Sequence, residues 1–272
     1  MLFSGLFLFY PTWNVVSGAF KDSANHFSAA TLFGLLKSPT VRHAFRNSLE
    51  ISLISAIAGA ILGGLFAWAL ATGKLGGFFY RISVALSSVL AQFGGIMLAF
   101  AFLATFGFNG LISTLAIKYA PHTFLADSAW LYGINGMIVV YTFFQIPLMV
   151  LVFLPTIENL RPQWREASDS LGGKPLEYWI RIGIPVLLPS FTGAALLLFV
   201  NSFSAYATAA TLINLSDFIT PLQIATALTS EVGGANPTEA KSLALIMVVV
   251  VIIVMTLYAL LRRKVSKWET TR

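Results

Sequence analysis

Charged side chains, which carry most protein chemistry, are concentrated at positions 158–181. Eight of these 24 residues are charged, whereas the whole chain of 272 residues has only 17 basic and 11 acidic side chains. The apolar regions contain no Ser/His/Asp or paired-carboxylate arrangement, the chain has no Cys, and His26, His43 and His122 are scattered. The sequence therefore predicts neither an enzyme active site nor a metal site, and the charged segment becomes the main candidate for function.

The charged segment has the pattern of two short helices joined by a glycine turn. Pro162 suits the first turn of a helix predicted over 163–171, and Gly172 accepts the left-handed conformation that closes a helix. A second helix is predicted over 176–182, and we expect the prolines that follow it to end it before the next apolar region. Such a helix–turn–helix is a rigid protrusion suited to contact a partner.

The side chains of the first predicted helix suit close contact with another protein. Ala167 and Ser168 are short enough to let a surface approach, and Trp164 and Leu171 flank them with apolar area. Glu166 can pair with an arginine of the partner or with an arginine of its own segment. The alternative is a solvated amphipathic linker stabilised by local salt bridges.

The remaining sequence predicts that a membrane positions this segment. Apolar residues make up 57% of the chain and charged residues 10%, with a mean hydropathy of +0.81, whereas soluble domains average about 25% charged residues. Disordered and nucleic-acid-binding classes are excluded because both need more charge. Six charge-free windows can each hold one helix of about 20 residues across a bilayer. The predicted spans are 2–20, 50–72, 82–106, 134–155, 190–213 and 243–262.

The basic residues predict the orientation of this single transmembrane domain, residues 1–272. Six spans place both termini and the 158–185 loop on one side, which holds 11 Lys and Arg residues against 6 on the other. The excess favours cytoplasmic termini in a multi-pass membrane protein. The first window lacks a basic leader and is interrupted by Pro11 and Trp13, so we expect a retained helix rather than a cleaved signal.

A spaced motif in the charged segment resembles a known family. The motif residues are Glu166, Ala167, Ser168, Gly172, Ile182 and Pro185. Their spacing is that of the EAA loop of ABC importer permeases: Glu-Ala-Ala, three residues, Gly, nine residues, Ile, any residue, Leu, Pro. Two positions depart from the pattern, with Ser168 in place of Ala and Ile184 in place of Leu. The location after the fourth predicted span also agrees with that family.

The resemblance implies an all-α, six-span type I importer domain with the MetI-like fold, in which 158–185 forms the cytoplasmic coupling helices. It also implies partners: two copies of an ATP-binding subunit, a second and different permease subunit, and an extracytoplasmic substrate-binding protein, in membrane lipid and without nucleic acid. The chain has no Gly-x-x-x-x-Gly-Lys-Ser/Thr loop, so we expect no cofactor here and ATP with Mg on the partner. The residues expected to couple the chain to that partner are Trp164, Glu166, Ala167, Ser168, Leu171, Gly172, Ile182 and Pro185.

Polar side chains inside the predicted spans could line a path for a solute, because such groups are costly in lipid and usually face a bundle interior or a cavity. The fifth span carries four at helical spacing, and the third and fourth carry one pair each. These residues are Ser88, Gln92, Tyr141, Gln145, Asn201, Ser204, Thr208 and Thr211. The alternative is hydrogen bonding between helices. No charged residue lies well inside a span, which disfavours an ion-coupled carrier.

Small residues also recur along the second predicted span. Ser52, Ser55, Gly59 and Gly63 follow one another at intervals of three and four, so they share one helical face. A face of this kind lets another helix backbone approach closely. The interpretation is helix packing within the bundle.

The sequence as a whole predicts a non-enzymatic permease subunit that forms the pathway for a small solute. The segment 199–212 resembles permeases of the polyamine, ferric-ion and phosphonate branch, which makes a polyamine-like solute the finer expectation. The alternative is a membrane scaffold or channel that recruits a cytoplasmic protein through the 158–185 loop. The two differ in whether a nucleotide drives movement of a solute.

Overall fold

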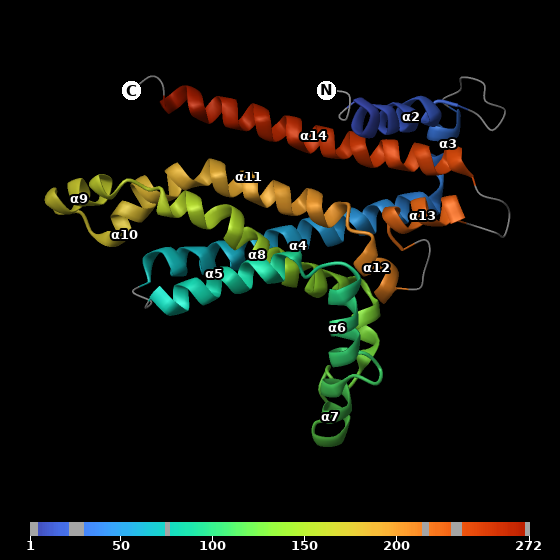
Figure 1. The fold of residues 1–272 in the computed structure, drawn as a ribbon, viewed down its shortest axis with the longest axis horizontal. Coiled ribbons are helices and arrows are strands. Elements are labelled where there is room, and N and C mark those ends of the chain that lie inside the picture. Colours follow the sequence, from blue (N-terminus) through green and yellow to red (C-terminus); the bar gives the residue numbers. More distant parts are fainter. Residues whose placement is uncertain (1–4, 22–29, 74–76, 214–217, 230–235, 270–272) are drawn as a thin grey trace.

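The computed structural model describes residues 5–21, 30–73, 77–213, 218–229 and 236–269, and every regular element in those ranges is helical (Figure 1). The elements are η1 Gly5–Phe9, α2 Tyr10–Ala19, α3 Ala30–Lys37, α4 Pro39–Thr72, α5 Gly77–Gln92, α6 Ile96–Phe106, α7 Leu111–Tyr119, η2 Ser128–Tyr132, α8 Ile134–Glu158, α9 Pro162–Ser170, α10 Pro175–Tyr178, η3 Trp179–Gly183, α11 Ile184–Phe203, α12 Ala207–Leu212, α13 Thr220–Thr229 and α14 Pro237–Glu269. Helices α4, α5, α8 and α11 form the central bundle, α9 and α10 lie at one end of it, and α2 runs along α14.

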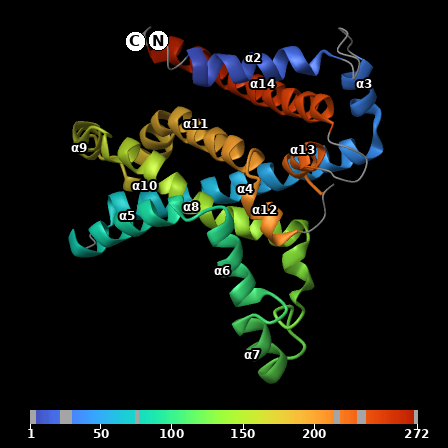
Figure 2. The ribbon, with the colours of Figure 1, turned by 45° about the vertical axis from the view of Figure 1, so that its right-hand side comes forward.

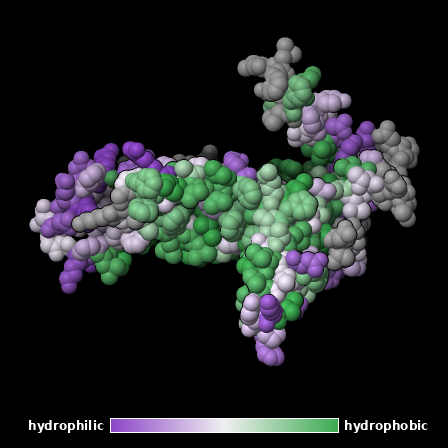
Figure 3. Space-filling view, turned by 60° about the horizontal axis from the view of Figure 1, so that its bottom comes forward, coloured by the Kyte–Doolittle hydropathy of each residue, from purple (hydrophilic) through white to green (hydrophobic). Residues whose placement is uncertain are grey.

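Five stretches of the described helices are long and apolar enough to cross a membrane. They are Pro39–Thr72, Ile96–Tyr119, Ile134–Glu158, Pro175–Phe203 and Pro237–Thr256. The first predicted span, 2–20, is helical over Gly5–Phe9 and Tyr10–Ala19, and its first residues lie outside the described ranges. The predicted count of six spans therefore stays a prediction. On the face shown in Figure 3, hydrophobic side chains cover the bundle, and hydrophilic ones gather at the end that carries α9 and α10.

The small-residue face of α4 packs against α8, as the sequence predicts. Ser52, Ser55, Gly59 and Gly63 are all buried. A Cβ atom at Gly63 would lie 2.6 Å from the carbonyl oxygen of Ile146 and 2.6 Å from the Cβ of Met149. The two backbones can approach this closely only because α4 has no side chain there.

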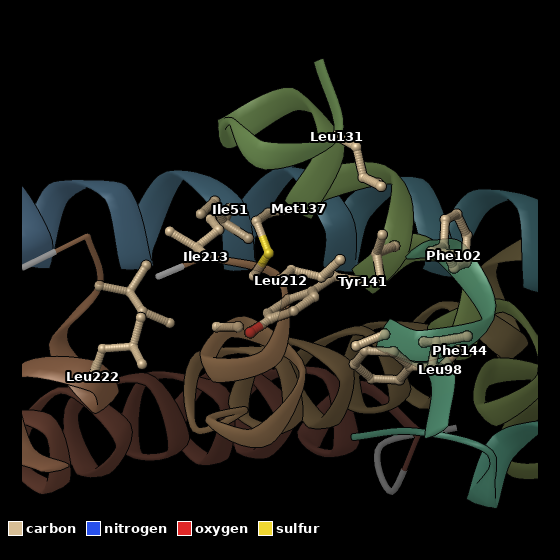
Figure 4. Close-up of a cluster of buried hydrophobic side chains, with 14 residues drawn as sticks. Ile51, Leu98, Phe102, Leu131, Met137, Tyr141, Phe144, Leu212, Ile213 and Leu222 are labelled. Carbon is tan, nitrogen blue, oxygen red and sulfur yellow. The ribbon is translucent and has the colours of Figure 1, made fainter. Parts of the chain in front are cut away.

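Two buried apolar clusters form the core of the bundle. One joins α4, α6, α8, α12 and α13, and Figure 4 shows Tyr141 of α8 at its centre, next to the segment that contains Leu212. The other joins the remaining halves of α4 and α8 to α11. At the boundary between them, the Gln145 amide donates a 2.8 Å hydrogen bond to the Ser55 hydroxyl, which lies 3.0 Å from that of Ser202. Three helices are thus joined by polar contacts at the middle of the bundle.

The third predicted span is not the single helix expected over 82–106. The helix ends at Gln92 and a new one begins at Ile96, and Gly95 between them has φ +67°. Glycine adopts this left-handed conformation without the steric cost of a Cβ, so the chain can turn there. As a result α6 leaves the bundle at a steep angle to α5 (Figures 1 and 2), and the stretch long enough to span a membrane is Ile96–Tyr119.

The fifth predicted span, 190–213, also differs from the expectation. Helix α11 ends at Phe203 and α12 begins at Ala207, so the expected continuous polar face is interrupted. Pro185 and Pro189 do not stop the preceding helix. Pro185 is the second residue of α11, directly after the π-helical segment Trp179–Gly183, and Pro189 lies inside α11. The helix is therefore continuous over Pro175–Phe203.

Candidate functional site

The first helix of the protrusion formed by α9 and α10 has little internal support. None of the nine residues of α9 is buried. Isolated helices of this length are marginal in water, because nucleation costs more than a few hydrogen bonds return. Leu171, which follows α9, is an apolar side chain with 90% of its surface exposed. Both features are those of an element that a partner covers.

The turn after α9 explains why glycine is needed there. Gly172 has φ +78°, as predicted, and its N–H donates to the carbonyl of Asp169 at 3.0 Å. The N–H of Gly173 donates to the carbonyl of Ser168 at 2.9 Å. These two bonds make a Schellman cap, which satisfies carbonyls at the helix end. A Cβ at Gly173 would lie 2.5 Å from the Ser168 hydroxyl, so the second glycine is also required.

The turn folds α9 back toward α10 and leaves a groove of about 460 Å³ between them. The lining includes six of the eight predicted coupling residues, Trp164, Ala167, Ser168, Leu171, Gly172 and Ile182. Glu166 and Pro185 lie outside it, both exposed. The sequence reasoning missed Tyr178, Glu177, Arg181 and Val186. Tyr178, Ile182 and Val186 follow at intervals of four, a helical repeat that could have identified them.

Charge pairing within the protrusion is local and weak. Glu177 and Arg181 form an exposed ion pair at 3.1 Å, one helical turn apart, and pairs of this kind contribute about 0.3–0.5 kcal/mol. The Arg161 guanidinium lies 5.8 Å from the ring centroid of Trp164. Among the described residues Glu166 forms no ion pair, so its carboxylate is available to a partner.

The base of the protrusion is tied to α5. The Tyr80 hydroxyl donates to the Glu158 carboxylate at 2.5 Å, which joins the start of α5 to the end of α8. This hydrogen bond to the carboxylate is the largest of three causes that raise the pKa of the Tyr80 hydroxyl; burial and the negative charge of Glu158 follow. The contact therefore joins α5 to the end of α8 from which the chain enters the protrusion.

The two helix breaks, Phe93–Gly95 and 204–206, lie close to each other. The Thr208 hydroxyl donates to the carbonyl of Gly95 at 3.2 Å, and the Tyr141 hydroxyl donates to the carbonyl of Ala205 at 2.8 Å. The Gly95 carbonyl also accepts from the N–H of Ala99 at 3.2 Å, so the Thr208 hydroxyl is a second donor to it. The two side-chain bonds link the breaks to neighbouring elements. Broken helices at membrane depth occur where protein or a water-filled cavity surrounds the break. We name this region the junction.

The structure separates the eight predicted pathway residues into two groups. Tyr141, Gln145 and Thr208 are buried and hydrogen-bond to other helices, which is the alternative that the sequence left open. Ser88, Gln92, Asn201 and Ser204 are exposed, and Thr211 is half-buried and bonds within α12. The exposed side chains of Gln92 and Ser204 border the two breaks. A role in a solute path therefore stays a prediction, with the exposed group as its better candidates.

The chain segments at the two breaks, 92–95 and 204–208, contain no Asp, Glu, His, Lys or Arg. The described residues contain no group of three His, Asp or Glu side chains able to hold a metal ion. What the junction offers is hydroxyl, amide and backbone carbonyl groups at the ends of helices. Such groups bind a small polar molecule by hydrogen bonds rather than by covalent chemistry.

The chain is similar to permease proteins of three transport systems. The probable sulfate transport system permease protein CysT of Helicosporidium sp. subsp. Simulium jonesii is 26% identical over 168 residues, which cover 62% of this chain and 59% of that protein. The spermidine/putrescine transport system permease protein PotB of Escherichia coli K12 is 25% identical over 74% of this chain and 74% of that protein. The ferric transport system permease protein FbpB of Actinobacillus pleuropneumoniae is 23% identical over 74% of this chain and 28% of that protein. The match covers less than two thirds of the first of these relatives. No protein-family model matches the chain.

Solved structures with the same fold are membrane domains of ABC importers. A bacterial ABC transporter involved in the import of the acidic polysaccharide alginate has a TM-score of 0.76 at 14% identity, covering 97% of this chain and 92% of that chain. An inward-facing MetNI methionine ABC transporter has a TM-score of 0.63 at 16% identity, covering 83% and 95%. The predicted all-helical, MetI-like fold is therefore confirmed, and the relatives are sulfate, polyamine and ferric ABC permeases.

Proposed function

We propose that this chain is a permease subunit of an ATP-driven importer, in which α9 and α10 dock on an ATP-binding subunit. The observation that carries the proposal is the α9–Gly172–α10 protrusion: it is capped into one shape, has an exposed apolar side chain at its turn, and has no buried residue in its first helix. The relation to ABC permeases supports the same assignment. The partner supplies the ATP site with its Mg, since this sequence has no phosphate-binding loop of that type.

One continuous helix connects the protrusion to the junction and forms a rod between them. The helix that starts in the protrusion at Pro175 continues to Phe203, where the junction begins. Its 29 residues extend over about 43 Å at the usual rise of about 1.5 Å per residue. Closure of the partner on ATP moves α9 and α10, and the rod transmits that movement to the helix breaks. The pathway then opens alternately to the two sides of the membrane.

The assembly contains two ATP-binding subunits, a second and different permease chain, and an external binding protein that delivers the solute. The two permease chains form the pathway between them in a bacterial inner membrane, with the protrusion on the cytoplasmic side. The basic residues, which are in excess on that side of the chain, support this orientation.

The proposed solute is small, polar and cationic, of the polyamine class. The relation to PotB over 74% of both chains supports this choice. Gln92 and Ser204 present amide and hydroxyl oxygens, and Tyr206 presents an exposed ring, all of which attract an ammonium group. Spermidine and sulfate uptake, measured side by side in reconstituted vesicles, decide between a cation and an anion.

Co-purification tests the docking role. The chain is expressed with its genomic neighbours, extracted in mild detergent and weighed by native mass spectrometry. We expect a complex of two permease chains with two ATP-binding chains. A chain that purifies alone, or with a protein that lacks an ATP site, contradicts the proposal and favours a scaffold.

Substitutions at Gly172 separate the shape of the turn from general damage. A Cβ at Gly172 meets nothing within 4 Å in this chain, so only its φ of +78° opposes a side chain. Gly172→Val is expected to disrupt the turn and lose the partner, whereas Gly172→Asn tolerates the left-handed conformation and keeps it. Gly77→Val, at another glycine with open space around it, is the matched control. Equal co-purification of Gly172→Val and the control refutes docking through this turn.

A further inference from the structure

A groove between α4, α11 and α14 has no part in the proposed transport. Its volume is about 670 Å³, and its walls are almost entirely apolar. The side chains that form the walls include Leu49, Leu53 and Ile57 of α4, Phe199 of α11, and Ile246 and Val254 of α14. An apolar groove that runs along membrane-crossing helices suits a hydrocarbon chain.

Charged side chains line one end of this groove. Arg42, Arg46 and Glu50 follow at intervals of four on α4, so they share one face of the helix. Both arginines are exposed, and among the described residues neither forms an ion pair. Glu50 is half-buried one turn further in. The mouth of the groove therefore carries two positive charges and one negative charge.

The part of the lining on α4 that lies beyond the two arginines is about as long as one leaflet of a bilayer is deep. Arg46 and Ile57 are eleven residues apart on α4, which corresponds to about 16 Å at a rise of about 1.5 Å per residue. Half of a hydrocarbon core of about 30 Å is about 15 Å. The mouth lies at the end of α4 opposite to α9 and α10, where α3 and α13 are found (Figure 1). A molecule with its polar end at the mouth would thus sit in the leaflet on the other side from the protrusion.

We propose that the groove binds one phospholipid with a single net negative charge, with the phosphate between Arg42 and Arg46 and the acyl chains along the apolar walls. Arginine presents paired N–H donors that fit a phosphate group. With Glu50 included, the net charge of the mouth is +1. This charge complements a lipid with one phosphate charge, and Glu50 disfavours a lipid that carries a second negative charge. Phosphatidylglycerol satisfies both conditions, and phosphatidylethanolamine, with no net charge, does not.

Lipid titration of the purified full-length chain tests this proposal. Phosphatidylglycerol and phosphatidylethanolamine with identical acyl chains are added separately, and bound lipid is counted by native mass spectrometry. We expect one phosphatidylglycerol to bind at least tenfold more tightly than phosphatidylethanolamine. Arg42→Gln with Arg46→Gln should weaken phosphatidylglycerol roughly thirtyfold, at the usual contribution of a basic residue near an anionic lipid.

Two further variants control the experiment. Arg81→Gln with Lys118→Gln removes two exposed positive charges outside the groove and should leave lipid binding unchanged. Ala195→Phe places a ring in the groove and should reduce binding of both lipids. Equal binding of the two lipids, or equal loss in both double-charge variants, overturns the proposal. Cross-linking of Ala195→Cys to a second permease chain in the assembled complex also overturns it, because a protein helix then fills the groove.

Discussion

Gly63 offers a direct test of how closely α4 approaches α8. The Cβ of Gly63→Ala would lie 2.6 Å from the carbonyl oxygen of Ile146 and from the Cβ of Met149, where ordinary contact begins at 3.4 Å. Both atoms belong to or adjoin the backbone of α8, so relief requires the helices to separate by about 0.8 Å. Overpacking of this kind costs about 1–3 kcal/mol, and replacing a helical glycine by alanine returns up to about 1 kcal/mol.

With the middle of the overpacking range, about 2 kcal/mol, the expected net loss for Gly63→Ala is about 1–2 kcal/mol, or roughly 2–8 °C in the thermal midpoint. Circular dichroism of the purified chain in detergent measures it. Gly34→Ala is the matched control, because Gly34 lies inside α3 with nothing within 4 Å of its Cβ position. The control should be neutral or slightly stabilising. If Gly63→Ala melts with the control or above it, the close approach of α4 and α8 is wrong.

Three further substitutions test the junction and the protrusion. Tyr141→Phe removes the donor to the carbonyl of Ala205 and should destabilise the chain by about 0.6–1.7 kcal/mol in a thermal melt, and an unchanged midpoint contradicts this bond. Thr208→Val keeps the side-chain shape but removes the donor to the Gly95 carbonyl; a loss of similar size is expected, and solute transport in vesicles should fall because the two breaks are no longer held together. Leu171→Ser should leave the melting of the isolated chain unchanged, because this side chain is exposed. It should weaken co-purification with the ATP-binding subunit at least tenfold, since burying a leucine in the interface contributes about 1.5–3 kcal/mol. Equal recovery of the mutant and the unmodified chain argues against docking at this side chain.

The first helix of the protrusion and the turn after it could be predicted from the sequence to within one or two residues, whereas the second helix, expected to end near residue 182, continues to Phe203. The first helix is expected over 163–171 and observed at Pro162–Ser170, and Gly172 has the positive φ that its place after a helix requires. These features depend on local rules, namely proline in a first turn and glycine at a helix end, which act over a few residues. The close packing of α4 was predictable for a similar reason, since small residues at helical spacing define a face.

The junction was not predictable in this way. The hydrophobic composition predicts one helix over 82–106 and one over 190–213. A sufficiently long apolar stretch meets the requirement for a membrane span, and composition alone does not show whether the helix is interrupted. The two breaks are held against the bundle by residues far away in the chain: Thr208 donates to the carbonyl of Gly95, and Tyr141 donates to the carbonyl of Ala205. Contacts of this kind depend on the tertiary packing and leave no pattern in the local sequence.

The sequence by itself determined that the chain enters a membrane, where its longest apolar stretches lie, and that a charged helical protrusion follows the fourth predicted span. Those properties depend on composition and on short-range spacing. The tertiary structure alone decided which polar side chains support helix breaks and which remain exposed, and that Arg42 and Arg46 stand at the mouth of an apolar groove. The reason is physical: a polar group in a bundle takes its role from the helix that packs against it, and helix pairing is a long-range property.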